Sequence, residues 1–237
     1  MKRLYLPPPL RQGPQSLTPD REHYLRNVLR LKSGAQIQVF DGTGVAATAT
    51  AEANGRKLSL TVAQLQPARD TGQPATHLAF ALLKGKANEQ VLRKATELGA
   101  TDLWPLYTDH TDVPRKLLTS ANGDHQQAIV ISACEQCGQN HLPRLHPGQT
   151  LDTLLEQAPV AQMLFADMDA EHFPAQLPAA DSMVIIGPEG GWSDRELDLV
   201  KARAIRRVNL GDLVLRAETA PLVALSMLTM ARRHNAV

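Results

Sequence analysis

The chain has 237 residues, of which 25 are Lys or Arg and 24 are Asp or Glu, giving a formal net charge of +1. This length favours one or two domains, and we expect two. Two cysteines are too few for a disulfide-stapled secreted domain and fit a reducing cytosol. The N-terminus lacks the apolar core of a signal peptide, and no apolar run is long and uncharged enough to span a membrane. We therefore expect a cytoplasmic protein without membrane segments.

The first 66 residues predict a small antiparallel β-barrel or sandwich. Asp41-Gly42 and Asn54-Gly55 are strong hairpin signals between strand-like runs. Before them, apolar residues at helical spacing predict a short helix over 23–31. The polar stretch 67–74 contains both Pro and Gly and reads as a linker, so the predicted domains are 1–70 and 74–237. The predicted strands are 36–40, 44–52 and 58–66.

From residue 77 onward, strand and helix patterns alternate, which predicts parallel strands joined by crossover helices. Ser193 followed by Glu196 has the spacing of a capping box at a helix start. The predicted strands are 77–83, 102–107, 162–166, 182–187 and 207–210, and the predicted helices include 87–98, 128–137, 194–204 and 221–233. The second domain is therefore predicted to be an α/β domain with a parallel sheet.

The segment 185–193, IIGPEGGWS, carries the first candidate site. An apolar strand runs into a glycine-containing loop, and Ser193 then starts a helix. Such a loop offers free backbone N–H groups at the carboxyl end of a parallel strand, where open α/β sheets bind ligands. It has neither the lysine of a phosphate-binding Walker loop nor the spacing of a dinucleotide fingerprint. A tight strand-to-helix turn without a ligand is the alternative.

The segment 210–220, LGDLVLRAETA, also follows a short strand and leads into a helix. Leu210, Leu213 and Leu215 can form an apolar slot for a flat ring. Arg216 and Glu218 offer opposite charges at a helix N-terminus, although a surface salt bridge beside a core helix would leave the same pattern. Side by side, the two loops would form one pocket.

Together with motifs elsewhere, these segments resemble the RsmE family of SPOUT methyltransferases. The supporting motifs are KATELG at 94–99, ACEQC at 133–137, IGPEGG at 186–191 and LRAETA at 215–220. The resemblance covers nearly the whole chain. It implies a PUA-like RNA-binding barrel, a SPOUT domain whose parallel sheet has a deep trefoil knot, and a homodimer. It also implies S-adenosylmethionine as cofactor and methylation of uracil N3 in 16S ribosomal RNA. The partner would be this RNA, either free or within the small ribosomal subunit.

The resemblance also implies roles for individual residues. Arg216 is the candidate for stabilising negative charge on the uracil, and Glu218 for orienting the base or accepting its proton. The catalytic base is left open. The residues expected to bind the cofactor are Leu164, Ile186, Gly187, Pro188, Glu189, Gly190, Leu210, Leu213, Leu215, Arg216 and Thr219. Those expected to bind RNA are Arg3, Arg11, Arg26, Arg30, Lys84 and Lys86.

The chain departs from the family pattern at three positions where arginine is usual, namely His110, Gln139 and Leu213. Each change removes positive charge, which affects RNA recognition more than the cofactor pocket. Two other functions therefore stay open. One is a non-catalytic RNA-binding or ribosome-assembly factor, and the other is a SPOUT methyltransferase with a different target nucleotide.

Several further residues suggest chemistry. Cys134 and Cys137 have C-x-x-C spacing, with His141 and His146 downstream, which raises a zinc site. Because the cysteines sit late in a helix and no second such pair exists, we expect no metal. For Asp109-His110 with Asp112 we expect a solvated loop rather than acid–base chemistry. Trp104 is expected in the core, while Trp192, beside the glycine loop, is the better functional candidate.

Overall fold

The computed structural model describes residues 1–54, 57–68, 72–111, 113, 120–157, 160 and 162–233. The chain divides into two compact units. The N-terminal unit comprises Met1–Thr71 together with Cys134–Leu142. The C-terminal unit comprises Gly72–Ala133 and Pro143–Val237.

The N-terminal unit is built on a five-stranded sheet with strand order β1-β3-β4-β5-β2. Its strands are β1 (Arg3–Tyr5), β2 (Gly13–Gln15), β3 (Gln36–Phe40), β4 (Ala46–Asn54) and β5 (Lys57–Val62). The antiparallel pairs β3–β4 and β4–β5 confirm both predicted hairpins. Strand β1 lies parallel to β3, so the expectation of a wholly antiparallel sheet is wrong. Alternate residues of β5 are buried, as expected for a sheet with one face on a core.

The predicted helix over 23–31 begins earlier than the sequence pattern indicates. Helix α1 (Pro19–His23) runs directly into a π-helical turn, η1 (Tyr24–Val28). The side chain of Thr18 accepts a hydrogen bond from the N–H of Arg21 and so caps α1. The helix buries Leu25, whereas Val28 is 61% exposed. Apolar spacing thus located the helix, and Tyr24 and Leu31 pack against the core of this unit as expected.

The segment 134–142 packs within the N-terminal unit. Cys134 is buried against Phe40 and Ala46, and burial raises the pKa of its thiol to about 12. The backbone N–H of Tyr5 donates to the carboxylate of Glu135 (2.9 Å). Cys134 therefore serves as a small apolar core residue. Among the described residues, no three His, Cys, Asp or Glu side chains gather in a group that could hold a metal ion.

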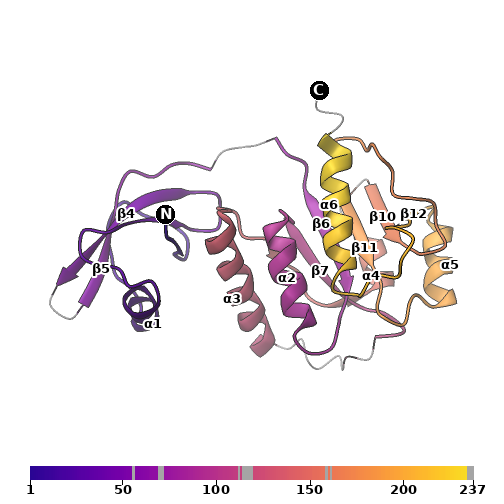
Figure 1. Cartoon of the computed structure of the whole chain (residues 1–237), viewed down its shortest axis with the longest axis horizontal. Helices are drawn as coiled ribbons and strands as arrows, with labels where there is room; N and C mark the ends of the chain where they lie inside the picture. Colours follow the sequence, from indigo (N-terminus) through magenta and orange to yellow (C-terminus); the bar gives the residue numbers. More distant parts are fainter. Residues whose placement is uncertain are drawn as a thin grey trace. The chain divides into compact units, whose positions relative to one another are not determined.

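The C-terminal unit contains a parallel sheet with strand order β12-β10-β11-β6-β7-β8, and β9 pairs with β7 (Figure 1). This confirms the predicted α/β class and parallel sheet. The strands are β6 (Thr76–Ala81), β7 (Asp102–Tyr107), β8 (Arg144–Leu145), β9 (Gln149–Thr150), β10 (Gln162–Ala166), β11 (Ser182–Ile186) and β12 (Arg206–Val208). The strand order does not decide whether the chain is knotted, so the trefoil knot stays a prediction.

Helices cover the sheet of the C-terminal unit. They are α2 (Ala87–Glu97), α4 (Leu151–Gln157), α5 (Asp194–Ala202) and α6 (Ala220–Arg233). A further helix, α3 (Ser120–Cys137), begins in this unit, and its residues from Cys134 onward belong to the N-terminal unit. Helix α6, yellow in Figure 1, contacts β6, β11 and α2. Leu154 of α4 and Val200 of α5 pack in one hydrophobic cluster with Phe165 and Ile185. Within the described residues, no helix combines the length and apolar character needed to cross a membrane.

Because β10, β11 and β12 lie side by side and parallel, their carboxyl ends open at one edge of the sheet. We call residues 187–193, between β11 and α5, the glycine loop. We call residues 210–219, between β12 and α6, the leucine loop. Both candidate segments therefore leave the sheet at the edge where open α/β folds bind ligands.

Candidate functional site

The glycine loop is fixed at its end by the start of α5. The Ser193 hydroxyl accepts a hydrogen bond from the N–H of Glu196 (3.2 Å), and the Glu196 carboxylate accepts one from the N–H of Ser193 (3.0 Å). This confirms the predicted capping box. Earlier in the loop, Gly191 has a φ of +72° and its N–H donates to the carbonyl of Pro188 (3.0 Å). The loop is thus a defined turn.

Trp192 ties the glycine loop to the neighbouring strand. Its ring packs on Phe165 with centroids 4.3 Å apart, and its Nε1 donates to the carbonyl of Ala166 at the end of β10 (2.9 Å). A Cβ at Gly187 would lie 2.8 Å from this indole, so only glycine fits there without moving the ring. Trp192 is therefore part of the site rather than a distant core residue.

A cavity of about 330 Å³ opens between the loops that follow β10, β11 and β12. This volume lies within the usual range for small-molecule sites. One wall is apolar, and two of its side chains, Leu213 and Val214, are 77% and 83% exposed. The lining residues are Ala166, Asp167, Met168, Asp169, Ile186, Gly187, Pro188, Glu189, Gly191, Trp192, Leu197, Leu210, Leu213, Val214, Leu215, Ala217 and Ala220.

Carboxylates give the cavity an acidic character. Asp167 is paired with Arg207, whose Nη2 lies 2.5 Å from the Asp167 carboxylate. Asp169 and Glu189 also line the cavity and are exposed. The site therefore combines an apolar wall with negative charge, which suits a ligand that has a flat ring and a positive group.

Most of the predicted cofactor residues line this cavity: Ile186, Gly187, Pro188, Glu189, Leu210, Leu213 and Leu215. Leu164, Gly190, Arg216 and Thr219 are not among its lining residues. Leu164 is buried inside β10, before the lining begins at Ala166. The sequence reasoning missed the segment 166–169, which has no glycine and no motif. The signal that could have found it is that β10 lies next to β11 and opens at the same edge.

Arg216 and Glu218 lie at the entrance to α6. The carbonyl of Arg216 accepts from the N–H groups of Thr219 (2.8 Å) and Ala220 (3.0 Å), which forms the first helical turn. The Arg216 side chain is exposed, and its neighbours Leu215 and Ala217 line the cavity. In the described part of the chain, Arg216 and Glu218 do not form the salt bridge that the sequence allowed. The guanidinium is therefore not neutralised by this carboxylate.

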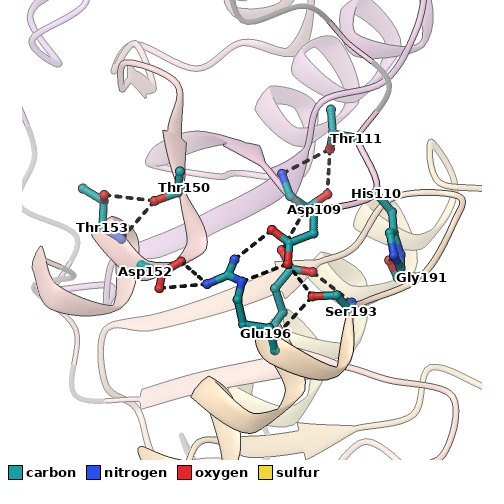
Figure 2. Close-up of polar contacts among 11 residues, drawn as sticks. Asp109, His110, Thr111, Thr150, Asp152, Thr153, Gly191, Ser193 and Glu196 are labelled. Atoms are coloured by element: carbon teal, nitrogen blue, oxygen red, sulfur yellow. Dashed lines mark hydrogen bonds and ion pairs between the residues drawn. The ribbon is translucent and has the colours of Figure 1, made fainter.

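The loop after β7 is exposed at Asp109 and His110, as expected, and a network of charges also holds it. Arg195 donates to both carboxylate oxygens of Asp109 (2.9 and 2.8 Å), and Ser193 donates to one of them (2.6 Å) (Figure 2). Hydrogen bonds from Arg195 and then Ser193 lower the pKa of Asp109 to about 2. The partners come from elements that are distant in sequence. Asp112 lies outside the described residues.

His110 lies beside the tip of the glycine loop, with its Nδ1 close to the carbonyls of Gly190 and Gly191 (3.2 and 3.1 Å). A neighbouring cavity of about 380 Å³ is lined by His110, Gly190 and Lys84. A larger cavity of about 1100 Å³ lies in the N-terminal unit beside His141 and contains none of the predicted site residues. The volume of a cavity thus does not by itself mark the site here.

The predicted RNA-binding residues are exposed, apart from Arg3. Arg26 also forms an ion pair with Glu22 (3.6 Å). The guanidinium of Arg3 lies over the ring of Phe40 at 4.8 Å and donates to Asn140 (2.6 Å), so it has internal partners. The exposed members are Arg11, Arg26, Arg30, Lys84 and Lys86.

Trp104 lies in the core of the C-terminal unit, and His146 packs against it. Trp104 is 8% exposed, which confirms the expected core position. The ring of His146 stacks on it, with centroids 3.3 Å apart, and its Nε2 bonds the Asp102 carboxylate (2.8 Å). The stacking on Trp104 and the hydrogen bond to Asp102 account for the position of His146 without a metal ion.

Comparison with known proteins identifies both units. The family described as RNA methyltransferase domain matches residues 71–229, and the family described as RNA methyltransferase PUA domain matches residues 17–62. The ribosomal RNA small subunit methyltransferase E of Synechocystis is 34% identical over 227 residues, covering 90% of this chain and 72% of the relative.

Two solved structures are similar along their whole length. A candidate methyltransferase of Legionella pneumophila with bound S-adenosylmethionine has a TM-score of 0.87 and 32% identity, covering 97% of each chain. The ribosomal RNA small subunit methyltransferase E of Neisseria gonorrhoeae, bound to S-adenosylmethionine, has a TM-score of 0.85 and 28% identity, covering 98% of each chain. These matches confirm the resemblance seen in the motifs, and the chain belongs to the ribosomal RNA small subunit methyltransferase E (RsmE) family.

Proposed function

We propose that this protein transfers a methyl group from S-adenosylmethionine to N3 of a uracil in 16S ribosomal RNA. One observation carries the proposal: the glycine loop and the leucine loop line a single cavity at the carboxyl ends of β10, β11 and β12. The family to which the chain belongs, and the two similar structures with bound S-adenosylmethionine, support the same cofactor.

The residues of the cavity fit S-adenosylmethionine. Its adenine ring is flat and matches the apolar side chains of Leu210, Leu213 and Leu215. Its sulfonium and amino groups are positive, and the exposed carboxylates of Asp169 and Glu189 provide negative charge. When bound, this cofactor supplies an electrophilic methyl group. The chain must then mainly orient the acceptor nitrogen.

Uracil N3 carries a proton at neutral pH, so the enzyme has to promote its loss. As the proton leaves, negative charge develops on the oxygens of the base, and a nearby guanidinium would stabilise it. Arg216 is exposed beside the cavity and is not paired with Glu218, which supports it in this role. Glu218 is our candidate for accepting the proton or orienting the base.

Basic side chains of the protein would bind the phosphates of the RNA. Arg11, Arg26 and Arg30 are exposed in the N-terminal unit, and Lys84 and Lys86 are exposed in the C-terminal unit. We leave Arg3 out because its guanidinium has internal partners. Replacing Arg30 with alanine should weaken binding of 16S ribosomal RNA and lower the slope of log affinity against log salt by about 1. An unchanged slope would remove Arg30 from the RNA-binding surface.

We further propose that the protein acts in the cytoplasm, where ribosomal RNA is modified, and as a homodimer. The family resemblance supports the dimer. Sedimentation equilibrium at micromolar concentration should give twice the mass of the chain. A monomer at every concentration would contradict this part of the proposal.

Calorimetry with S-adenosylmethionine is the first test of the enzyme. We expect one site per chain, and no detectable binding would exclude the methyltransferase function. A chain that binds the cofactor but transfers no methyl group would instead be an RNA-binding or assembly factor.

Mass spectrometry of ribosomal RNA from a deletion strain tests the target. The strain should lack a methylated uracil in its 16S RNA, and retention of every such base would exclude this target.

A further inference from the structure

The tip of the glycine loop, Gly190-Gly191, has no side chains with which to hold its own conformation. Glycine has the widest range of backbone conformations, so ordering this tip is entropically costly. The N–H of Gly191 is already used in the turn bond to Pro188. Gly191 and its neighbours Pro188 and Glu189 line the cofactor cavity. The carbonyl groups of Gly190 and Gly191 are therefore the groups through which another segment can restrain this wall further.

His110 supplies such a restraint. Its Nδ1 lies 3.2 Å from the carbonyl oxygen of Gly190. It lies 3.1 Å from that of Gly191, which Figure 2 shows beside the imidazole ring. Carbonyl oxygens only accept hydrogen bonds, so Nδ1 must carry the proton and donate it to this pair. A Cβ at Gly190 would lie 3.1 Å from the Cβ of His110, which shows how closely the two segments approach. The contact joins residues that are 80 positions apart.

The residue before His110 is itself fixed to the start of α5. Asp109 receives two hydrogen bonds from Arg195 and one from the Ser193 hydroxyl. Its backbone N–H donates to the carboxylate of Glu196 (3.1 Å), which is 0% exposed. Figure 2 shows Asp109, Ser193 and Glu196 converging on this point. Side chain and backbone of Asp109 are thus both anchored.

The anchor extends to a third element. Nη1 of Arg195 also donates to both oxygens of Asp152 in α4 (3.0 and 2.9 Å). On the other side of the loop, the hydroxyls of Thr108 and Thr111 bond each other (2.6 Å) and close the turn that carries His110. Single exposed ion pairs contribute little, but a planar guanidinium held by two carboxylates fixes orientation.

We propose that His110 is a positioning residue that holds the tip of the glycine loop against the cofactor cavity, and that the Asp109–Arg195–Asp152 network holds His110 in place. This inference rests on the proposed function, because it takes the cavity to be the site of S-adenosylmethionine. His110 acts through the backbone of the loop and need not touch the cofactor. Its test must therefore separate cofactor affinity from stability.

The test is calorimetry with S-adenosylmethionine on the full chain carrying His110→Asn or His110→Asp. The amide of asparagine can donate to the two carbonyls, whereas a carboxylate of the same size can only accept and repels them. We expect His110→Asn to bind within about twofold of the wild type and His110→Asp to bind about 3- to 10-fold more weakly. Melting temperatures should stay close to the wild type, because His110 is exposed.

His125→Ala provides the matched control. His125 is an exposed histidine of α3 whose Nε2 contacts Glu89 (3.2 Å), so its loss also removes a surface contact. The cofactor affinity of the His125→Ala variant should equal that of the wild type. Arg195→Ala tests the network, and we expect its loss of affinity to be non-additive with His110→Asp, since both act on one contact.

The possible results separate the two proposals. A wild type that binds no S-adenosylmethionine contradicts the proposed function itself. A wild type that binds, with equal affinities for the asparagine and aspartate variants, overturns only the role of His110. Strictly additive losses in the double variant overturn the role of Arg195 in holding it. A lower melting temperature of the His110 variants, with unchanged cofactor affinity, would show that His110 merely stabilises the fold.

Discussion

The glycine loop and the leucine loop face the same cavity but are built in different ways. The glycine loop is tied down by the indole of Trp192, the capping box at Ser193 and the side chain of His110. The leucine loop leaves Leu213 and Val214 77% and 83% exposed. Exposed apolar side chains beside a cavity indicate a surface that a ligand would cover.

This difference indicates that the two loops have different roles in cofactor binding and in the reaction. A wall that is already ordered binds a cofactor without a large entropic cost, so the glycine loop should govern affinity. The leucine loop carries the exposed guanidinium of Arg216 beside the cavity and should govern the reaction. Variants of Arg216 and variants of the glycine loop should therefore affect different measured quantities.

The largest effect is expected from Arg216→Ala in the leucine loop. Loss of one group that stabilises developing charge typically lowers kcat by about 100- to 1000-fold. Affinity for S-adenosylmethionine should stay within about threefold, because Arg216 does not line the cavity. Single-turnover methyl transfer and calorimetry measure the two quantities. Arg203→Ala, at the exposed end of α5, is the control. An unchanged rate would remove Arg216 from the mechanism.

Gly190→Val should have the next largest effect and should act on binding. The added side chain would push against His110, whose Cβ is 3.1 Å from the position of a Cβ at Gly190. Overpacking of this kind should weaken S-adenosylmethionine binding by about 5- to 150-fold in calorimetry. Gly123→Ala is the matched control, since a Cβ there meets no atom within 4 Å. Undiminished affinity would contradict the view that the glycine loop is a fixed wall.

Leu213→Ser probes the apolar wall of the leucine loop. If the adenine ring covers Leu213, the change should weaken cofactor affinity by about 3- to 10-fold. The melting temperature should not change, because Leu213 is largely exposed without a ligand. Val28→Ser, at a 61% exposed position of the N-terminal unit, is the control. Equal affinities would show that this side chain does not contact the ring.

The smallest effect concerns stability at the opposite end of the sheet. His77, at the start of β6, is buried and its Nδ1 accepts from Trp104 (3.2 Å). Burial lowers the pKa of His77, although the nearby carboxylate of Asp102 raises it. The folded state therefore binds a proton less readily than the unfolded chain.

Stability from His77 should be complete above about pH 6.5 and fall as the pH drops through the lower, folded pKa. The slope is limited to about 1.4 kcal/mol per pH unit for one proton. Thermal melts between pH 8 and 5 would show it, and His77→Gln should flatten the curve. A wild type and variant with the same pH dependence would assign the effect to other groups.

Periodic segments of the fold were accessible from sequence. The strands Asp102–Tyr107 and Gln162–Ala166 have the predicted bounds because continuous apolar runs of strand length are distinctive. The strands Arg3–Tyr5 and Gly13–Gln15 were not predicted, since three residues are too few to show alternation. Helix α3 begins at Ser120 rather than 128, because its first turns contain an Asn-Gly pair that resembles a loop.

The site was predictable where it is local and unpredictable where it depends on distant contacts. The capping box at Ser193 and the glycine loop follow from neighbouring residues. The contacts of Asp109 with Arg195 and of His110 with Gly190 join residues 86 and 80 positions apart. No local pattern encodes such pairs. The position of Asp167 beside the cavity likewise depends on the order of the strands.

The most direct test is methyl transfer by the purified chain to small ribosomal subunits that lack the modification. After incubation with S-adenosylmethionine, the 16S RNA is digested and its nucleosides are measured by mass spectrometry. The account predicts that 3-methyluridine approaches one per subunit with the wild type and is nearly absent with Arg216→Ala. No methylated nucleoside, or a methyl group on a different base, would contradict it.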